Sequence, residues 1–330
     1  RLRALNDWLS GIDSVSGSTL QPASVDASFR RYFRLHKRGQ SFIVMDAPPE
    51  QEDCLPYIRV AGFLETMQLN APRILEANLD AGFLLLTDLG SRQYLDVLRD
   101  EPDRVSSLYS DALQALAHMQ IRGTPYQHSL PPYDEKLLRF ELSLFHDWLC
   151  GTHLGITFDA DEEREWQTLC DVLVRSALEQ PAVIVHRDYH SRNLMVTPEH
   201  NPGILDFQDA VEGPLTYDLA SLLKDCYVRW DTQFVRSWVQ EFYDQLDAAM
   251  QQQVDFRSFN RYFDLMGVQR HIKAAGIFSR LNHRDGKPAY MLDIPRTVSY
   301  IVDLGPQYPE LDWLVALISS RVLPILEAEQ

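Results

Sequence analysis

The stretch from 181 to 225 constrains the fold of this chain more than any other part of it. Short apolar runs within it, each bounded by polar or turn-forming residues, predict three strands, at 183–185, 194–196 and 203–205. A polar loop joins the first two strands, and a turn that contains prolines joins the last two. The third strand ends on a carboxylate, Asp206.

The loop after the first strand carries polar residues at the spacing H-x-D-x-H-x-x-N, namely His186, Asp188, His190 and Asn193, and Asp206-Phe207-Gln208 follows the third strand. In phosphoryl transfer from a nucleotide, a loop Asp orients and deprotonates the attacking hydroxyl. An Asn five residues later and an Asp on the next strand hold the metal ion. The pattern therefore predicts Asp188 as the catalytic base, and Asn193 and Asp206 as ligands of Mg²⁺ bound with ATP.

With these motifs the sequence resembles the aminoglycoside phosphotransferase and choline kinase superfamily, relatives of the protein kinases. The branch that acts on small molecules has a His two residues after the catalytic Asp, so the resemblance assigns His190 to the catalytic site. Gln208 replaces the Gly of D-F-G, and we expect no flipping activation segment. Tyr217-Asp218-Leu219-Ala220 matches a family helix whose Asp supports the catalytic loop from behind.

The resemblance implies an α+β, two-lobed protein-kinase-like fold. Its small N-terminal lobe, with an antiparallel sheet and the hinge, is expected at 1–90. Its larger, mainly helical C-terminal lobe, with the catalytic loop, the metal site and the substrate-binding helices, is expected at 91–330.

Each acidic residue also has a local explanation. Asp188 is compatible with a turn, Asp206 with an Asx turn at a strand end, and Asp218 with a helix N-cap, because Asp is favoured at all three kinds of position. Their occurrence together, in the family's order and spacing, favours the catalytic interpretation.

Composition excludes several classes of function. With 330 residues, 45% of them hydrophobic, the chain can bury a sizeable core. A formal net charge of −16 disfavours a nucleic-acid partner. Four scattered cysteines are typical of reduced thiols, and the sequence has neither an apolar run of eighteen residues nor a secretory leader pattern. We expect a cytoplasmic monomer with no membrane partner.

The N-terminal region predicts an amphipathic helix within 1–14 and three antiparallel strands within 20–47, the part of a kinase that covers the nucleotide. The first hairpin lacks a glycine-rich loop, and Ser28 is the candidate phosphate contact there. A sharper departure is Met45, which occupies the place of the strand lysine that holds the nucleotide phosphates in kinases.

Arg30 and Arg31 are the nearest candidates to replace that lysine, because a guanidinium pairs well with phosphate oxygens. The alternative is that both are solvated strand residues, one on each face. Val44 is included in the predicted nucleotide site. The run 82–86 predicts a buried strand, and Thr87 and Leu89 after it match the family hinge, whose backbone groups bind adenine.

Helical periodicity dominates the rest of the chain, with helices expected near 105–119, 134–149, 166–177, 219–229, 232–250, 256–283 and 310–328. Basic residues are concentrated at 257–287, where a strip that includes Arg270 and Lys273 is a candidate site for an anionic substrate group. The alternative is a solvated or ion-paired face. Asp209 is a further candidate substrate contact, and 283–304 is expected to be a loop that closes over the substrate.

Several segments spread over nearly the whole length, among them DASFRRYFRL, LLLTDLG, VIVHRDYHSRNLMV and QRHIKAAGIFSRLNHRDGK, resemble those of one bacterial branch of the family. These are the kinases that use ATP to phosphorylate the anomeric hydroxyl of N-acetylmuramate and N-acetylglucosamine in cell-wall recycling, so a small amino sugar is the implied substrate. Two competing hypotheses are a kinase of aminoglycosides or other small alcohols, and a nucleotide-binding pseudokinase, which Met45 suggests.

Overall fold

The computed structural model describes residues 1–25 and 29–328, so Ser28 lies outside the described residues. The chain forms two compact units, each considered by itself below. The first unit comprises Arg1–Leu108 and Arg192–Asp209, and the second comprises Tyr109–Ser191 and Ala210–Gln330. The lobe boundary expected at residue 90 stays a prediction.

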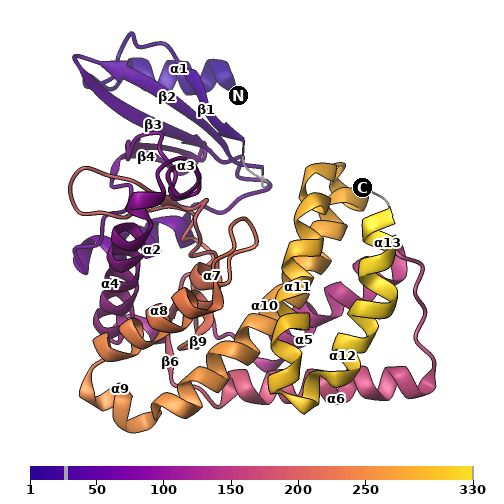
Figure 1. The fold of residues 1–330 in the computed structure, drawn as a ribbon. Coiled ribbons are helices and arrows are strands. Elements are labelled where there is room, and N and C mark those ends of the chain that lie inside the picture. The colour runs from indigo at the N-terminus through magenta and orange to yellow at the C-terminus, as the bar shows by residue number, and fades with distance from the viewer. Residues whose placement is uncertain (26–28, 329–330) are drawn as a thin grey trace. The chain divides into compact units, whose positions relative to one another are not determined.

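The first unit contains a five-stranded antiparallel sheet with the order β1-β2-β3-β5-β4 (Figure 1). Its strands are β1 (Gln21–Val25), β2 (Arg31–Lys37), β3 (Gln40–Asp46), β4 (Ile74–Asn78) and β5 (Phe83–Thr87). The strands predicted within 20–47 and at 82–86 are confirmed. The sequence did not predict β4, an edge strand whose middle residues are all exposed and which therefore lacks an apolar alternation.

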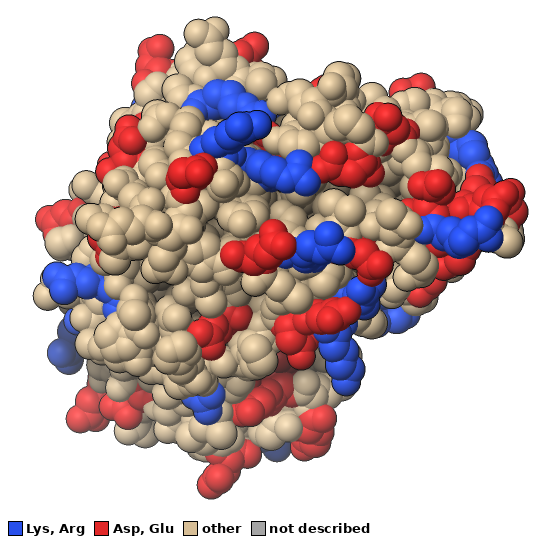
Figure 2. Space-filling model, turned by 90° about the horizontal axis from the view of Figure 1, so that it is seen from below, with Lys and Arg blue, Asp and Glu red and all other residues tan. Residues whose placement is uncertain are grey.

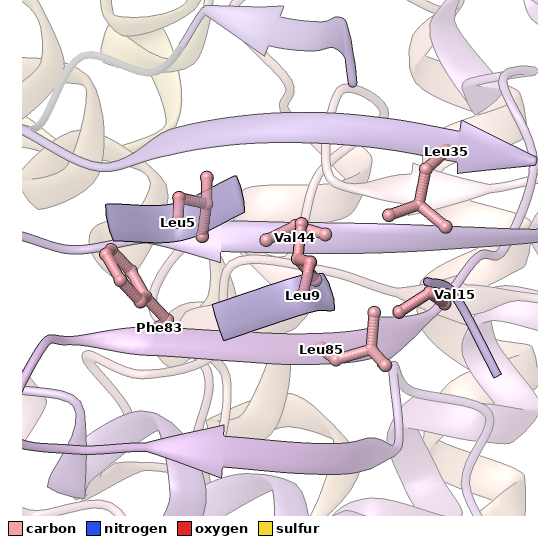
Figure 3. Packing of buried hydrophobic residues seen from close by; sticks show 7 residues of the cluster. All are labelled: Leu5, Leu9, Val15, Leu35, Val44, Phe83 and Leu85. Atoms are coloured by element: carbon pink, nitrogen blue, oxygen red, sulfur yellow. The ribbon is translucent and has the colours of Figure 1, made fainter. Parts of the chain in front are cut away.

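One face of this sheet is covered by helix α1 (Leu2–Ser10), the predicted N-terminal helix. Figure 3 shows Leu5 and Leu9 of α1 packed against Val44, Phe83 and Leu85 of the sheet. Because side chains alternate along a strand, these contacts define an α1 face and an opposite face for every strand of the sheet.

The remaining elements of the first unit are α2 (Leu55–Thr66), α3 (Tyr94–Asp100) and the start of α4 (Val105–Gly123). The predicted hairpin of β7 (Leu194–Met195) and β8 (Gly203–Ile204) joins them from far along the sequence. The backbone N–H of Ile204 donates to the carbonyl of Asn70 at 2.7 Å, and Gln93 pairs with Met195. These bonds attach the segment that carries Asn193 and Asp206 to the first unit.

The second unit is mainly helical around a two-stranded antiparallel pair, β6 (Ala182–Val185) and β9 (Val211–Pro214). Beyond the end of α4, its α-helices are α5 (Glu135–Leu144), α6 (Ala160–Leu178), α7 (Tyr217–Leu223), α8 (Thr232–Gln245), α9 (Ala248–Gln253), α10 (Phe256–Asp285), α11 (Ile294–Leu304), α12 (Asp312–Leu317) and α13 (Leu323–Ala328). The long helix α10 packs against α5, α7 and α11 (Figure 1). A Cβ at Gly276 of α10 would lie 2.3 Å from the backbone of Leu144, so the close approach to α5 requires glycine there.

The loop expected at 283–304 is wrong over most of its length. Gly286 adopts φ +65° and ends α10, after which Pro288–Asp293 forms a 3-10 turn and α11 begins at Ile294. Proline in the first turn of a helix removes an N–H that has no partner within the helix, so Pro288 and Pro295 start these elements rather than prevent them.

Charges of both signs are mixed on the face of the molecule shown in Figure 2. Lys and Arg side chains lie there among Asp and Glu side chains, and the described residues on this face form no continuous basic surface. Among residues 1–25 and 29–328, no helix has both the length and the apolar character needed to cross a membrane.

We expect Leu9→Ala to lower the free energy of unfolding by about 2–5 kcal/mol, because it opens a cavity between α1 and the sheet. Leu2→Ala on the same helix is the control; Leu2 is 47% exposed, and we expect a loss within about 0.5 kcal/mol. Urea denaturation followed by circular dichroism measures both variants. Equal losses for the two leucines would contradict the packing of α1 on the sheet.

Candidate active site

A buried carboxylate on α7 supports the start of the predicted catalytic loop. Asp218 accepts hydrogen bonds from the backbone N–H groups of His186 at 2.6 Å and Arg187 at 2.9 Å. Burial raises the pKa of Asp218 to about 7, against the opposing effect of these bonds and of Arg270. The supporting role that the family motif implied for Asp218 is confirmed.

A second buried carboxylate, Asp225, holds the other end of the loop. Its Oδ2 accepts the backbone N–H of Ser191 at 3.0 Å and the Ser191 hydroxyl at 2.5 Å. Sequence reasoning missed Asp225. Its only local signal is its place just after α7. An acidic residue is common at such a position because its side chain can hydrogen-bond to the nearby backbone, so the position alone does not indicate a contact with the loop.

Asp188 lies between these two attachments and is only half-buried. Although burial alone would raise the pKa of Asp188, the positive charges of Lys273, His190, Arg270 and Arg187 lower it to about 2. The carboxylate is therefore ionised at neutral pH. It can accept a hydrogen bond from a substrate hydroxyl, while its low basicity makes orientation a larger contribution than proton abstraction.

Glu141 on α5 is a buried carboxylate that binds several residues around the loop. Its Oε1 pairs with Arg187 at 2.6 Å and with Lys273 at 2.9 Å, while its Oε2 accepts hydrogen bonds from the Tyr133 hydroxyl and, at 3.1 Å, from Gln269. Although burial would raise the pKa of Glu141, the charges of Lys273 and Arg187 lower it. Sequence reasoning missed Glu141, because its partners lie on distant elements.

Arg270 and Lys273, the predicted substrate contacts, therefore have structural partners. Arg270 donates to the carbonyl of Arg187 at 2.8 Å and its guanidinium lies 4.5 Å from the ring centre of Tyr217. Lys273 also donates to the Tyr217 hydroxyl at 2.8 Å. Lys273 is buried and Arg270 half-buried, so they do not form part of a solvated basic strip.

The two predicted metal ligands lie together in the first unit. The Asn193 amide donates to Asp206 Oδ2 at 3.3 Å, and the backbone N–H of Leu205 donates to the Asn193 carbonyl at 2.9 Å. Gln208 donates to Asp206 Oδ1 at 2.8 Å. Asp206 adopts φ +63°, a conformation that non-glycine residues rarely take and that often marks functional sites.

This pair fits the predicted magnesium site. In the described ranges, no group of three or more His, Cys, Asp or Glu side chains is arranged to hold a metal ion alone. Mg²⁺ does not require such a group, because one or two protein oxygens suffice beside phosphate oxygens and waters. Rotation of the Asn193 amide would present its oxygen next to the Asp206 carboxylate.

Arg30, just before β2, belongs to the same acidic surroundings. It pairs with Glu52 at 2.9 Å, and its side chain is only 9% exposed. Although burial alone would lower the pKa of Arg30, the charges of Tyr32, Glu52, Asp209 and Asp206 raise it. Arg30 is therefore a buried cation that is held by Glu52 and attracted by the negative charge of Asp206, a predicted metal ligand.

Arg31 and Val44 were predicted to belong to the nucleotide site. Both lie on the α1 face of the sheet, which α1 covers, and the structure corrects their assignment. Arg31 binds Asp46, which also accepts a 2.8 Å hydrogen bond from Arg1. Val44 packs against α1 (Figure 3). Met45, on the opposite face, is fully buried, so the position of the missing lysine is filled by an apolar side chain.

The predicted hinge follows β5. The backbone N–H of Thr87 donates to the Arg73 carbonyl at 3.0 Å, and the Thr87 hydroxyl accepts the backbone N–H of Arg73 at 2.9 Å. Leu89 is half-buried and lies 2.9 Å from where a Gly203 Cβ would be. Asp88 between them pairs with Arg34 at 2.6 Å, which immobilises the segment.

Two predicted site residues remain, His190 in the second unit and Asp209 in the first. The His190 ring lies edge-on to Tyr227, with ring centres 5.4 Å apart. Asp209 is exposed in the first unit, 3.5 Å from the Gln208 amide. The chain passes from the second unit to the first between Ser191 and Arg192, so Asp188 belongs to one unit and the Asn193–Asp206 pair to the other.

The sequence is similar to those of known phosphotransferases and kinases. A model of the phosphotransferase enzyme family matches residues 19–256. The chain is 46% identical to an N-acetylmuramate/N-acetylglucosamine kinase of Pseudomonas aeruginosa, an alignment that covers 97% of this chain and 96% of that protein. Proteins with the same name from Pseudomonas putida and Neisseria meningitidis are 44% and 38% identical, with at least 95% of each chain covered.

Solved structures show the same fold. Choline kinase LicA from Streptococcus pneumoniae matches with a TM-score of 0.59 and 11% identity, over 91% of this chain and 98% of that one. The GDP complex of aminoglycoside 2′-phosphotransferase-IIIa matches with a TM-score of 0.63 and 14% identity, over 90% and 98%. The predicted α+β kinase-like fold is confirmed.

We expect Glu141→Gln to lower the free energy of unfolding at pH 7 by about 3–5 kcal/mol, because it leaves Arg187 and Lys273 buried without their carboxylate. The control is Glu135→Gln on the same helix, whose exposed pair with Arg139 contributes about 0.5 kcal/mol or less. Urea denaturation measures both variants.

The loss of stability caused by Glu141→Gln should depend on pH. The pKa of Glu141 is lower in the folded chain than its ordinary value of 4.5, so its contribution is present above pH 4.5 and is lost as the pH falls through the folded pKa. The stability difference between wild type and Glu141→Gln should therefore shrink on acidification. A constant difference down to the acid transition would refute the ion-pair account.

Proposed function

We propose a sugar-kinase activity for this chain, which belongs to the phosphotransferase enzyme family. In this proposal, ATP with Mg²⁺ phosphorylates the anomeric hydroxyl of N-acetylmuramate and N-acetylglucosamine to give the sugar 1-phosphate, in the recycling of peptidoglycan. The observation that carries the proposal is an ionised Asp188 in a loop held at both ends, in a chain similar over nearly its full length to kinases named for these sugars.

Asp188 is proposed to accept the hydrogen bond of the anomeric hydroxyl and to orient it toward the γ-phosphate. Phosphoryl transfer has a loose transition state, so the lowered pKa of Asp188 is compatible with the role: the proton needs an acceptor only late in the reaction. Asn193 and Asp206 would hold Mg²⁺, which supplies charge neutralisation at the phosphates when bound. His190 remains a proposed member of this catalytic loop.

Arg30 is proposed to take the place of the missing strand lysine. It combines a buried guanidinium, a carboxylate partner in Glu52 and the electrostatic influence of Asp206. A lysine and a glutamate are paired in this way in protein kinases, and the pairing fixes the cation against the nucleotide phosphates. Thr87 and Leu89 remain the proposed adenine contacts. Nucleotide complexes of two structural neighbours, one with GDP and one with AMP, support nucleotide binding.

The charge around Asp188 favours a neutral or weakly anionic sugar over a cationic alcohol. In the second unit, the cations Arg187 and Lys273 both pair with Glu141, and Arg270 adds a further positive charge near Asp188, so the described residues around Asp188 have no excess of carboxylates. An aminoglycoside or choline would need a clear excess of carboxylates. The predicted monomeric state, the cytoplasmic location and the role of Asp209 stay predictions.

The proposed function is tested by measuring ADP release with Mg-ATP and a panel of N-acetylglucosamine, N-acetylmuramate, an aminoglycoside and choline. We expect turnover with the two amino sugars only. Turnover with the aminoglycoside or choline alone would favour the competing kinase. A thermal shift with Mg-ATP but no turnover on any compound would favour a pseudokinase.

We expect Asp188→Asn to lower kcat by about 10²–10⁴-fold, because the neutral amide can neither orient nor deprotonate the hydroxyl. Nucleotide binding, measured by calorimetry, should be retained. Asp171→Asn, an exposed carboxylate of the second unit, is the control and should keep full activity. An active Asp188→Asn enzyme would exclude Asp188 from catalysis.

Alanine variants of Arg30 and Arg31 test the proposed phosphate contact, with Arg31 as the control. Arg30→Ala should raise the KM for ATP by about tenfold or more, because it removes a charge-assisted contact to phosphate. Arg31→Ala should leave this KM unchanged and lower thermal stability instead, because Asp46 loses a partner on the α1 face. Steady-state kinetics with a melting curve separate these effects, and the reverse pattern would refute the assignment.

A further inference from the structure

A row of aromatic side chains begins at the catalytic loop of the second unit. The His190 ring, two residues after Asp188, meets Tyr227 edge-on at 5.4 Å between ring centres. Tyr227 lies 6.3 Å from Phe278 of α10, and Phe278 stacks on Tyr290 at 5.5 Å and 25°. The row runs from His190, in the predicted catalytic loop, to Tyr290 in the 3-10 turn at Pro288–Asp293.

The first tyrosine of the row is fixed by the same carboxylate that fixes the loop. Asp225 accepts the backbone N–H of Tyr227 at 2.9 Å on Oδ1, while its Oδ2 holds Ser191. The position of the Tyr227 ring is thereby tied to that of Asp188. At the far end, Phe278 is buried in α10 and supports Tyr290 from behind.

Tyr227 and Tyr290 are half-buried, whereas Phe278 is only 6% exposed. The two tyrosines therefore keep part of their surface accessible on a fixed apolar support. Ligand sites commonly combine such an aromatic wall with a small number of polar groups that set orientation. Here the polar groups are Asp188 and the cations that surround it.

A pyranose ring matches this combination of surfaces. Its axial C–H bonds form an apolar face that packs on the face of an aromatic ring, while its hydroxyls project at the edge toward polar groups. A sugar whose anomeric hydroxyl contacts Asp188 would have its ring near the same loop, where the row begins at His190, two residues after Asp188.

We propose that Tyr227 and Tyr290 form the platform on which the sugar ring packs, with Tyr227 next to the reacting end. This inference rests on the proposed sugar-kinase function and names the residues that recognise the ring. The platform contributes contact area and orientation, and it takes no part in the chemical step.

The test uses the full chain with four variants: Tyr227→Leu, Tyr290→Leu, Tyr227→Phe and the control Tyr262→Leu. Tyr262 lies on α10 outside the aromatic row. We expect Tyr227→Leu to raise the KM and the dissociation constant for N-acetylglucosamine roughly tenfold, with Tyr290→Leu showing a smaller rise. Tyr227→Phe and Tyr262→Leu should stay within about twofold of wild type, and the KM for ATP should not change.

A second measurement on the wild-type protein covers the case in which Tyr227→Leu does not fold. Saturation-transfer NMR with N-acetylglucosamine should show the strongest transfer at the axial ring protons. Transfer confined to the acetyl methyl group would overturn the platform, as would an unchanged sugar KM in both leucine variants of an active enzyme. If the wild-type enzyme neither binds nor phosphorylates an N-acetylated sugar, the proposed function itself is wrong and the platform is rejected with it.

Discussion

The structure of the candidate active site depends on buried carboxylates that accept the backbone N–H groups of the predicted catalytic loop. A loop that turns away from a strand leaves N–H groups without ladder partners, and burying them unpaired is costly. Asp218 satisfies the N–H groups of His186 and Arg187, and Asp225 satisfies that of Ser191. Arg187 adopts φ +78°, a conformation that persists only where the surroundings hold it. The backbone on both sides of Asp188 is thus held by two buried acids, Asp218 and Asp225.

A third buried acid, Glu141, contributes to the electrostatics of the candidate site. Arg187, Arg270 and Lys273 lower the pKa of Asp188. Arg187 and Lys273 both pair with Glu141, and Arg270 donates to the backbone carbonyl of Arg187. Glu141 neutralises two of these cations and is itself almost inaccessible. The result is a fixed carboxylate in balanced surroundings, which is suited to orienting a polar but uncharged hydroxyl group and not to collecting a cationic substrate.

Sequence reasoning succeeded where one short stretch contained all the partners. The strands around the loop follow from short apolar runs, and the support from Asp218 follows from a motif in the same stretch that resembles the family. Asn193 and Asp206, predicted as ligands of one metal ion, lie together. It failed where the partner lay far along the chain. Glu141 is 132 residues from Lys273, and no local pattern connects them. Alternation placed Arg30 and Arg31 on opposite faces, but only the packing of α1 shows which face each occupies. The helical 288–304 segment was mistaken for a loop because its prolines stand at helix starts.

The central claim of the proposed function is that Asp188 orients the sugar hydroxyl and that Asn193 and Asp206 hold the Mg²⁺ of the nucleotide. The most direct test is a crystal structure of the protein with N-acetylglucosamine, Mg²⁺ and a non-hydrolysable ATP analogue. The account predicts Mg²⁺ at about 2.0–2.1 Å from an oxygen of Asp206 and from the amide oxygen of Asn193, with the anomeric hydroxyl about 2.6–3.2 Å from Asp188. A sugar bound with another hydroxyl at Asp188, or a nucleotide bound away from Asp206, would contradict it.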